Sequence, residues 1–495
     1  MPSRVIDVAI VGCGPVGALL ANLLGPSGLT VEVFEREAEL WRLPRAVHFD
    51  GEVMRIFQAA GLAAEVARVA REGTRGMHFV NAEGRTLLVR GIAEGPGPQG
   101  WATSWYFHQP DLEGVLRAGL ARYPNVRLHL RHEVLAIEQD ASGARLRVGG
   151  PCGDATHATR YVVGCDGARS MLRRLIGGGD YDLGLHQPWL VADLLLKRDL
   201  GLPSWTVQHC NPARPMTEVC VTGQRRRWEI MLMPGDDPQG ITAPERVWEF
   251  IGARVTPADA ELERAALYTF HSVIARSWRD RRLLIAGDAA HQTPPFLGQG
   301  MCAGMRDAAN LAWKLAAILR GAAPEALLDT YATERVPHAR AFIELAVEIG
   351  ALIQTTDARR AAERDKSFAQ GEEQVFQFPA PPLGPGAHLG TAPAGRLFPQ
   401  PRLGDGRRLD EAIGERFAVL GARAAIEGAG AAAARAWDVL GAARLPDPGG
   451  EAGAWLAARG LAAVLLRPDR YVFAAVQDAA ALAAASLRLP GAPQP

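Results

Sequence analysis

The first 35 residues constrain the fold of this chain most strongly. Residues 6–11 form an apolar, partly β-branched run, which predicts a buried parallel strand. This run leads into the glycine-rich sequence GCGPVG at 12–17, and a helix is expected from about 16 to 24. A second apolar strand, at 31–34, ends in Glu35. Strand, turn, helix and strand in this order are typical of an α/β protein with a parallel sheet.

The glycine turn and Glu35 together predict a dinucleotide site. Gly12 permits the tight turn, Gly14 lets a pyrophosphate approach the backbone, and Gly17 allows close helix packing. Glu35 stands where a carboxylate accepts hydrogen bonds from both ribose hydroxyls. A glycine-rich turn without a ligand is the alternative. The residues predicted at this site are Gly12, Gly14, Pro15, Val16, Gly17, Glu35 and Arg36.

A second segment far downstream, LIAGDAAH at 284–291, has the same order of an apolar strand followed by a turn and a helix start. An apolar strand delivers Asp288 to a turn, where its carboxylate can hold a polyol hydroxyl. The helix expected to begin at 298–300 offers free N–H groups that can stabilise negative charge on a ring. Two such sites on one chain imply a long ligand.

The remaining sequence divides into further units. Alternating strands between about 189 and 270 predict an antiparallel sheet, and long helices are expected at about 300–319 and 328–353. The predicted domains are 1–180 with 271–375 for the cofactor and 181–270 for the substrate. A Pro/Gly-rich linker at 376–400 then leads to a small α/β domain at 401–495.

Composition excludes several classes of protein. The 495 residues are 48% hydrophobic, and 54 basic residues balance 54 acidic ones. We therefore expect neither a nucleic acid nor a membrane as a partner. The six cysteines are scattered and include no CxxC pair, so neither a metal site nor a disulfide framework is expected. A cytoplasmic location fits best, because the first residues lack the apolar core of a signal peptide.

Three fingerprints resemble those of the class A FAD-dependent aromatic hydroxylases. They are GCGPVG with Glu35, CDGARS at 165–170 and AGDAAHQTPPFLGQG at 286–300. Over residues 5–350 the chain is most similar to the 3-(3-hydroxyphenyl)propionate hydroxylase group, as PRAVHFDGEVMR at 44–55 and GMRDAANLAWKL at 304–315 illustrate. The tail from about 400 resembles the thioredoxin-like C-terminal domain of phenol and polyketide hydroxylases.

The resemblance implies an α/β fold of the para-hydroxybenzoate hydroxylase type. It has a Rossmann-like FAD-binding domain, an antiparallel-sheet substrate domain and a C-terminal thioredoxin-like domain, which here lacks cysteine and cannot exchange thiols. It also implies hydroxylation of a phenol, ortho to a hydroxyl, with NADH or NADPH and O2 through a flavin C4a-hydroperoxide. A tailoring oxygenase of a polyketide or other polycyclic phenol and a non-catalytic flavin-binding protein are the alternatives. A homodimer is left open.

Carried over position by position, the resemblance also assigns cofactor contacts. Arg45 and Gln109 would lie by the pyrophosphate and the ribityl chain, and Asp166 with Gly167 would support the turn near the phosphates. The remaining residues implied for the ribityl chain and the flavin ring are Gly287, Asp288, Pro295, Gly298, Gly300 and Met301.

Candidate catalytic and substrate residues follow less directly. Pro295 resembles the proline whose carbonyl approaches the substrate phenol, and His48 falls near the flavin ring, where a packing role is the alternative. His209 lies on a substrate-domain strand, where a structural role is the alternative. Trp228 and Ile230 share one face of a strand, and we expect that face, rather than the face of Glu229 and Met231, to line the pocket. Phe296 is expected to form a pocket wall.

The arginines of the substrate domain leave two readings open. Arg214 and the run Arg225, Arg226 and Arg227 form a local basic group. They could bind a carboxylate of the substrate, or they could be ordinary solvated arginines.

Overall fold

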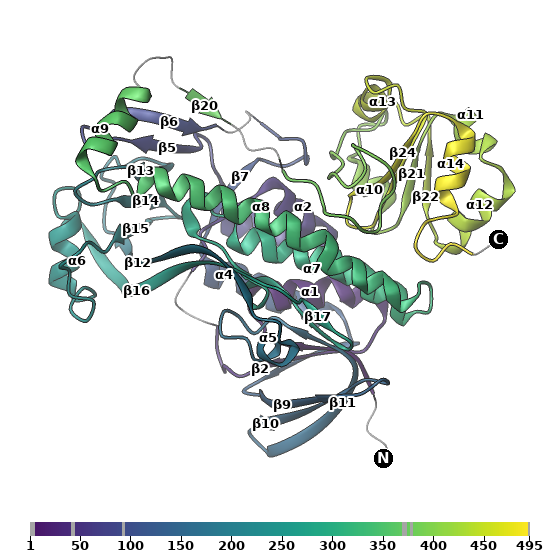
Figure 1. Ribbon diagram of the computed structural model, residues 1–495, viewed down its shortest axis with the longest axis horizontal. Coiled ribbons are helices and arrows are strands. Elements are labelled where there is room, and N and C mark those ends of the chain that lie inside the picture. The colour runs from purple at the N-terminus through teal and green to yellow at the C-terminus, as the bar shows by residue number, and fades with distance from the viewer. Residues whose placement is uncertain (1–4, 41–44, 92–94, 369–373, 377–379, 494–495) are drawn as a thin grey trace.

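The computed structural model describes residues 5–40, 45–91, 95–368, 374–376 and 380–493. Figure 1 shows three parts: a lower sheet near the N-terminus, a second sheet on the left, and a separate unit near the C-terminus. The long helices α7 (Gly300–Leu319) and α8 (Asp329–Ile353) run between them. No helix among the described residues is long and apolar enough to cross a membrane.

The first sheet has the parallel core that the sequence predicts. Its strands follow the order β17-β18-β11-β1-β2-β8, and the pairs β1–β2, β1–β11, β2–β8 and β11–β18 are parallel. Helix α1 packs against α4 and α7. The bounds are β1 (Ile6–Val11), α1 (Pro15–Leu24), β2 (Val31–Glu35), α4 (Gln109–Gly119), β8 (Val126–Leu130), β9 (Glu133–Gln139), β10 (Ala144–Gly150), β11 (Gly153–Gly164), β17 (Arg279–Asp280) and β18 (Leu283–Ile285).

The second sheet has nine strands in the order β19-β16-β12-β15-β14-β13-β5-β6-β20. Its centre is antiparallel, as expected, with β12 between β15 and β16. The bounds are β5 (Met77–Val80), β6 (Thr86–Arg90), β12 (Asp180–Leu196), β13 (Thr206–His209), β14 (Met216–Cys220), β15 (Arg225–Met231), β16 (Ala260–Ala275), β19 (His291–Gln292) and β20 (Gln374–Phe376).

Four strands of this sheet correct the domain boundaries expected from sequence. Strands β5 and β6 lie within residues 1–180, and β19 and β20 lie beyond residue 270, yet all four pair in the second sheet. The physical reason is a shared core, because Phe79 and Leu88 join the same buried cluster as Trp189 and Phe296. The substrate-side sheet is therefore assembled from four separate segments of the chain.

A small three-stranded sheet connects the two large ones. Strand β7 (Ser104–Phe107) pairs antiparallel with β3 (His48–Asp50) and with β4 (Ala70–Glu72). Helix α2 (Gly51–Ala59) begins directly after β3, and Asp50 caps it by accepting a hydrogen bond from the Val53 amide. The other described helices are α3 (Ala63–Val69), α5 (Met171–Ile176), α6 (Pro244–Ile251) and α9 (Ala358–Ser367).

The C-terminal unit contains a four-stranded sheet in the order β22-β21-β23-β24. Strands β21 and β22 are parallel and joined through helices, whereas β23 and β24 are antiparallel and lead into α14. This order agrees with the thioredoxin-like domain that the resemblance implies. The bounds are α10 (Leu409–Ile413), β21 (Ala418–Gly421), α11 (Arg423–Gly428), α12 (Gly430–Val439), β22 (Ala443–Pro446), α13 (Gly450–Ala457), β23 (Ala463–Leu466), β24 (Val472–Val476) and α14 (Ala479–Ser486).

The described part of the expected linker, 380–400, packs closely on the protein. Leu383 and Phe398 are buried, and the carbonyl oxygen of Phe398 accepts a hydrogen bond from Arg55 Nη1. Leu397 forms a β-bridge with Tyr471. These contacts fix the linker to both parts that it joins.

Candidate active site

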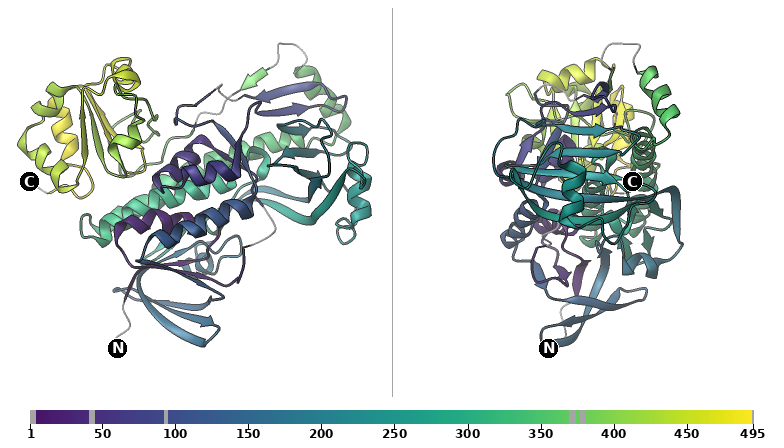
Figure 2. Two further views of the ribbon diagram at one scale, coloured as in Figure 1. Left: turned by 180° about the vertical axis from the view of Figure 1, so that it is seen from behind. Right: turned by 90° about the vertical axis from the view of Figure 1, so that its left-hand side faces the viewer.

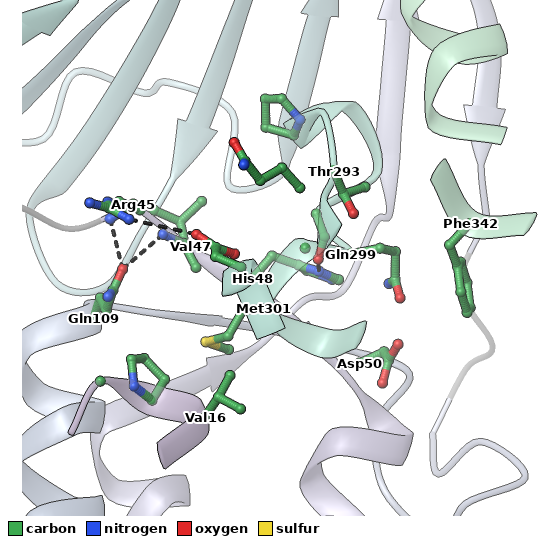
Figure 3. Close-up of a pocket in the computed structure, with 18 of the residues that line it drawn as sticks. Val16, Arg45, Val47, His48, Asp50, Gln109, Thr293, Gln299, Met301 and Phe342 are labelled. Atoms are coloured by element: carbon green, nitrogen blue, oxygen red, sulfur yellow. Dashed lines mark hydrogen bonds and ion pairs between the residues drawn. The ribbon is translucent and has the colours of Figure 1, made fainter. Parts of the chain in front are cut away.

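A cavity of about 1700 Å³ extends from the carboxyl ends of β1 and β2 to the inner face of the nine-stranded sheet. A typical small-molecule site occupies about 300–1,000 Å³. The cavity therefore has room for a long ligand and a second molecule beside it. Figure 3 shows its middle part, with Arg45 and Gln109 at one side, His48 in the centre and Phe342 at the other side.

The glycine turn has the geometry of a phosphate site. Gly12 has a φ of +96°, and a Cβ there would lie 2.5 Å from the carbonyl oxygen of Cys165. A Cβ at Gly17 would lie 2.1 Å from the carbonyl oxygen of Gly12, so both positions exclude a side chain. Gly14, Pro15 and Val16 line the cavity, and no described side chain caps the start of α1. The helix therefore presents free N–H groups to a ligand.

Glu35 is held at the end of β2 and faces the same cavity. Its Oε2 accepts a hydrogen bond from the Cys13 amide at 2.8 Å, and its Oε1 accepts one from the Glu37 amide at 2.9 Å. Each carboxylate oxygen keeps a further lone pair, so Glu35 can accept hydrogen bonds from two ribose hydroxyls. Arg36 also lines the cavity, with a side chain that is 68% exposed.

Arg45 and Gln109 lie close together in the cavity wall (Figure 3), and Asp288 lines the same cavity. Gln109 Oε1 accepts hydrogen bonds from the amides of Arg45 and Ala46, at 2.7 and 2.9 Å, and therefore fixes the loop that carries Arg45. The Arg45 guanidinium lies 3.6 Å from the Asp288 carboxylate. Both side chains are about half exposed, at 55% and 43%.

Asp166 supports a turn at the edge of the cavity. Its Oδ2 accepts hydrogen bonds from the amides of Met171 and Leu172, at the start of α5. Its Oδ1 is buried without a hydrogen-bond partner among the described residues. Gly167, with a φ of +73°, follows it in the cavity wall. This orphaned acceptor, next to an open wall, fits a site that a polar ligand completes.

The start of α7 forms the far end of the cofactor side. Gly298 has a φ of +63°, and a Cβ there would lie 2.9 Å from His48 Nδ1, so only glycine fits between them. Pro295, Gly300 and Met301 line the cavity, and no described side chain caps α7. As at α1, unpaired N–H groups point toward a ligand that carries negative charge.

His48 joins this turn to strand β7. Its Nε2 lies 3.0 Å from Ser104 Oγ, and its Nδ1 lies 3.5 Å from the carbonyl oxygen of Gly298. Burial, together with the positive charge of Arg90, lowers the pKa of His48 to about 4. The imidazole is therefore neutral at pH 7 and acts there as a hydrogen-bonding group rather than a cation.

The structure corrects the predicted orientation of β15. Trp228 and Ile230 are buried with Leu190 in the hydrophobic cluster that also contains Val247 of α6. Neither belongs to the cavity wall. The alternate residues of the same strand, Glu229 and its neighbour Arg227, line the cavity instead. The prediction was wrong because the more apolar face of the strand packs on a helix.

Phe296 and His209 also lie outside the cavity wall. The ring of Phe296 packs against Trp189 and Phe270, with centroids 5.6 and 6.1 Å away. Of these three rings, Phe270 reaches the cavity. His209 Nε2 lies 3.7 Å from Glu218, beside a smaller cavity of about 530 Å³. His209 therefore lies away from the main cavity.

Several cavity residues were not identified from the sequence. They come from strands of the nine-stranded and the three-stranded sheets, where core residues alternate with them. The sequence shows that side chains alternate between the two faces of each strand, but this alternation does not tell which face lines a cavity. They are Arg90, Ser104, Tyr106, Thr206, Gln208, Thr217 and Phe270, whereas Arg227 and Glu229 were named from the sequence only as alternatives.

Buried polar contacts connect the cavity with the C-terminal unit. Tyr471 Oη donates to Glu52 Oε1 at 3.0 Å, and Glu52 Oε2 accepts from Arg306 Nε at 2.6 Å. Arg306 also donates to Asp50 Oδ2 at 2.5 Å and to Gln299 Oε1 at 3.1 Å. All four of these partners line the cavity, so Tyr471 bonds directly to its wall through Glu52.

The residues present fit FAD. The free N–H groups of α1 and the carboxylate of Glu35 suit its pyrophosphate and ribose, and Asp288 suits a polyol chain. The uncapped start of α7 suits the negatively charged edge of its ring. Among the described residues, no group of three His, Cys, Asp or Glu side chains could hold a metal ion.

Comparisons with known proteins agree with this geometry. Residues 5–346 match a family model described as "FAD binding domain". A relative from Rhodococcus jostii (strain RHA1), named probable NADH-specific resorcinol 4-hydroxylase, is 37% identical over 99% of this chain and 96% of its own length. A 3-(3-hydroxy-phenyl)propionate/3-hydroxycinnamic acid hydroxylase from Mycobacterium sp. (strain KMS) is 38% identical over 84% of this chain and 74% of its own.

A solved structure extends the likeness to the C-terminal unit. It is a ternary complex of aklavinone-11 hydroxylase with FAD and aklavinone, and it has a TM-score of 0.82 at 26% identity. The match covers 99% of both chains. The expected fold and the expected cofactor are thus both confirmed. The chain belongs to the FAD-binding-domain family and is one of its FAD-dependent aromatic hydroxylases.

Proposed function

We propose that this protein hydroxylates a small phenol, ortho to its hydroxyl group, with NADH and O2 as co-substrates. The observation that carries the proposal is the continuity of one cavity. The part of the cavity whose residues fit FAD continues, past His48 and Gly298, to the inner face of the nine-stranded sheet. NADH rather than NADPH is proposed because the Rhodococcus relative is named NADH-specific.

Bound FAD would carry electrons from NADH to O2 and deliver one oxygen atom to the aromatic ring. The protein's part is to hold this cofactor and to place charge near it. The turn at 12–17, Glu35 and Asp288 would hold its dinucleotide part. The N–H groups at Gly300 and Met301 would stabilise negative charge on the reduced ring.

The turn before α7 would also orient the phenol. The carbonyl oxygen of Pro295 accepts a hydrogen bond from the Gly298 amide at 2.8 Å and keeps a second lone pair. Because Pro295 lines the cavity, that lone pair can accept the phenolic O–H. His48 is a positioning residue in this proposal, because it holds Ser104 and the Gly298 turn. The hydrogen bond to this carbonyl would orient the phenol and increase the electron density of its ring, with the proton remaining on the phenol oxygen.

A tailoring oxygenase acting on a polycyclic phenol is the second candidate. The size of the cavity and the similarity of the whole chain to aklavinone-11 hydroxylase favour it. Product analysis with small and polycyclic phenols separates the two candidates. A cytoplasmic location is proposed with either, because the six cysteines are all free.

The test combines cofactor content with product formation. The purified protein should be yellow, with one non-covalent FAD per chain, and phenols should accelerate NADH oxidation with one oxygenated product per NADH. FAD bound without substrate-stimulated oxidation would instead identify a non-catalytic flavin-binding protein. Asp288→Ala should weaken FAD binding about 10-fold or more, since a hydrogen bond to a charged group contributes about 1.5–3 kcal/mol. The exposed Asp199→Ala is the matched control, and equal FAD affinity in both variants would contradict the placement of the cofactor.

A further inference from the structure

A row of polar residues crosses the inner face of the nine-stranded sheet. Gln208 on β13 pairs in register with Thr217 on β14, and Thr217 pairs with Glu229 on β15. Glu229 in turn pairs with Val191 on β12. All four residues line the cavity. Neighbouring strands thus bring their polar side chains to one strip of the wall, opposite the apolar core that contains Trp228.

Two members of this strip bond to each other. Thr217 Oγ1 donates to Gln208 Oε1 at 2.5 Å, and Gln208 Nε2 donates to Met77 Sδ at 3.5 Å. Both residues are almost completely buried, at 3% and 1% exposure. Their main hydrogen-bonding groups are therefore satisfied within the protein.

Glu229 differs from them. It is 7% exposed, and no described residue donates a hydrogen bond to its carboxylate. Its nearest charged partner is Arg227 Nη1, at 3.9 Å. Burial raises the pKa of Glu229, as expected for a carboxylate without close donors. A buried acceptor that lines a cavity without a hydrogen bond is a site for a donor from a ligand.

Arg227 forms its hydrogen bonds with groups other than Glu229. Its Nε and Nη2 donate to the two carboxylate oxygens of Asp193 at 2.7 and 3.1 Å, and its Nη1 donates to the carbonyl oxygen of Arg45. Arg264 adds a second ion pair to Asp193 at 3.1 Å. Arg227 is thus already paired with a carboxylate, and the group that this strip offers to a ligand is the carboxyl group of Glu229.

We infer that Glu229 accepts a hydrogen bond from a second hydroxyl group of the substrate, and that the substrate is a neutral polyhydroxylated phenol rather than an aromatic carboxylate. The inference rests on the proposed function and adds the class of phenol to it. A hydroxyl bound to a carboxylate makes a strong charge-assisted hydrogen bond. A substrate carboxylate in the same place would lie against the carboxyl oxygens of Glu229, while the nearby guanidinium of Arg227 is already paired with Asp193.

Three probes test this inference on the wild-type holoenzyme. They are 1,3-dihydroxybenzene, phenol and 3-(3-hydroxyphenyl)propionate, with dissociation constants from calorimetry in the absence of NADH and kcat/KM from product formation. We expect 1,3-dihydroxybenzene to bind about 10-fold or more tightly than the other two. Tighter binding of the propionate would overturn the inference.

Variants assign the preference to Glu229. In Glu229→Gln, binding of 1,3-dihydroxybenzene should weaken about 10–100-fold, while binding of phenol changes less than about 3-fold. The propionate should bind more tightly than in the wild type. Glu229→Asp keeps the charge but shortens its reach, so it should also weaken the dihydroxybenzene selectively. Glu263→Gln, at an exposed position on β16 of the same sheet, is the matched control.

The outcomes separate the inference from the proposed function. Equal losses for phenol and 1,3-dihydroxybenzene in Glu229→Gln, with FAD content retained, would overturn the role of Glu229 while hydroxylation of phenols stands. Absence of oxygenated product from every phenol in the wild type would overturn the proposed function and the inference with it.

Discussion

His48 shows what the cavity does to a single residue. Its imidazole bridges Ser104 of β7 and the Gly298 turn, and its pKa is lowered to about 4 by burial and by the charge of Arg90. A neutral imidazole can keep one tautomer, donating through one nitrogen and accepting through the other. The turn before α7 is therefore held by a group whose charge does not change near neutral pH.

This lowered pKa makes stability depend on pH. Between about pH 6.5 and 4 an unfolded chain protonates this histidine and the folded protein does not, so the free energy of unfolding falls as the pH falls. From pH 7 to 5 we expect His48 to account for a loss of about 1–2 kcal/mol in the FAD-free protein. Urea unfolding at both values should show a smaller loss for His48→Gln. The surface variant His132→Gln should behave as the wild type, and equal losses in all three would contradict the effect.

Single residues also show where prediction from sequence ends. Gly12, Gly17 and Glu35 could be identified because short-range geometry requires those residue types next to a phosphate and a ribose. Glu229 could not, because a carboxylate on an alternating strand is equally typical of a solvated face. Only the contact of Trp228 with α6 decides that Glu229 faces the cavity.

At the scale of elements, β15 separates a core from a binding surface. Trp228 is 1% exposed, and it packs with residues of β12 and α6. The same strand places Arg227 and Glu229 on the other side of the sheet. Substitutions on the two faces should therefore have different consequences.

Trp228→Ala should act on stability and not on substrate selectivity. Removing this buried ring should lower the free energy of unfolding by about 3–5 kcal/mol, because the surrounding core leaves a void. Denaturant unfolding and the ratio of product to NADH consumed measure the two effects. Trp205→Ala, at a partly exposed position, should cost much less. If Trp228→Ala instead lowered the ratio of product to NADH and left the free energy of unfolding unchanged, Trp228 would have to be assigned to the substrate site.

Elements were predictable where their pattern is local. Helix α7 matches its predicted range, and α8 begins one residue later than expected, because both show sustained helical periodicity. Strands β5 and β6 were missed. They are short, and they depend on β13, which contributes Val207 as the register partner of His78 more than a hundred residues away. No local pattern signals such a pairing.

At the scale of the whole molecule, the C-terminal unit is attached by buried charges. It lies beside α2, α7 and α8 (Figure 2). Arg467 donates to both carboxylate oxygens of Glu334 at 2.9 Å and to Asp469 at 2.6 Å. Lys314 also donates to Glu334, at 2.8 Å, and the charges of Arg467 and Lys314 hold the pKa of Glu334 far below its usual value although burial opposes this.

Arg467→Met should loosen this attachment. It leaves the carboxylates of Glu334 and Asp469 without their main partner, and breaking a buried pair in this way costs about 3–5 kcal/mol. Limited proteolysis should then cut more readily within 380–400, and the thermal midpoint should fall. The exposed pair of Arg423 and Asp447 lies in the same unit, so Arg423→Met should change neither result by much. Equal protection of both variants would show that apolar contacts alone hold the unit.

The strands of the nine-stranded sheet come from separate segments of the chain, and this affects how substrate specificity can evolve in such an enzyme. Strands β5 and β6 come from before residue 91, β19 comes from residues 291–292 and β20 comes from after residue 373, so all four lie outside the stretch 180–275 that supplies the central strands. On the ribosome, the nascent sheet therefore stays incomplete until residue 376 has emerged. Recombination that exchanges one contiguous block between homologues brings foreign strands against resident neighbours. Exchanging the whole sheet for that of a homologue thus requires four matched segments, and single substitutions on the inner face are the shorter evolutionary route.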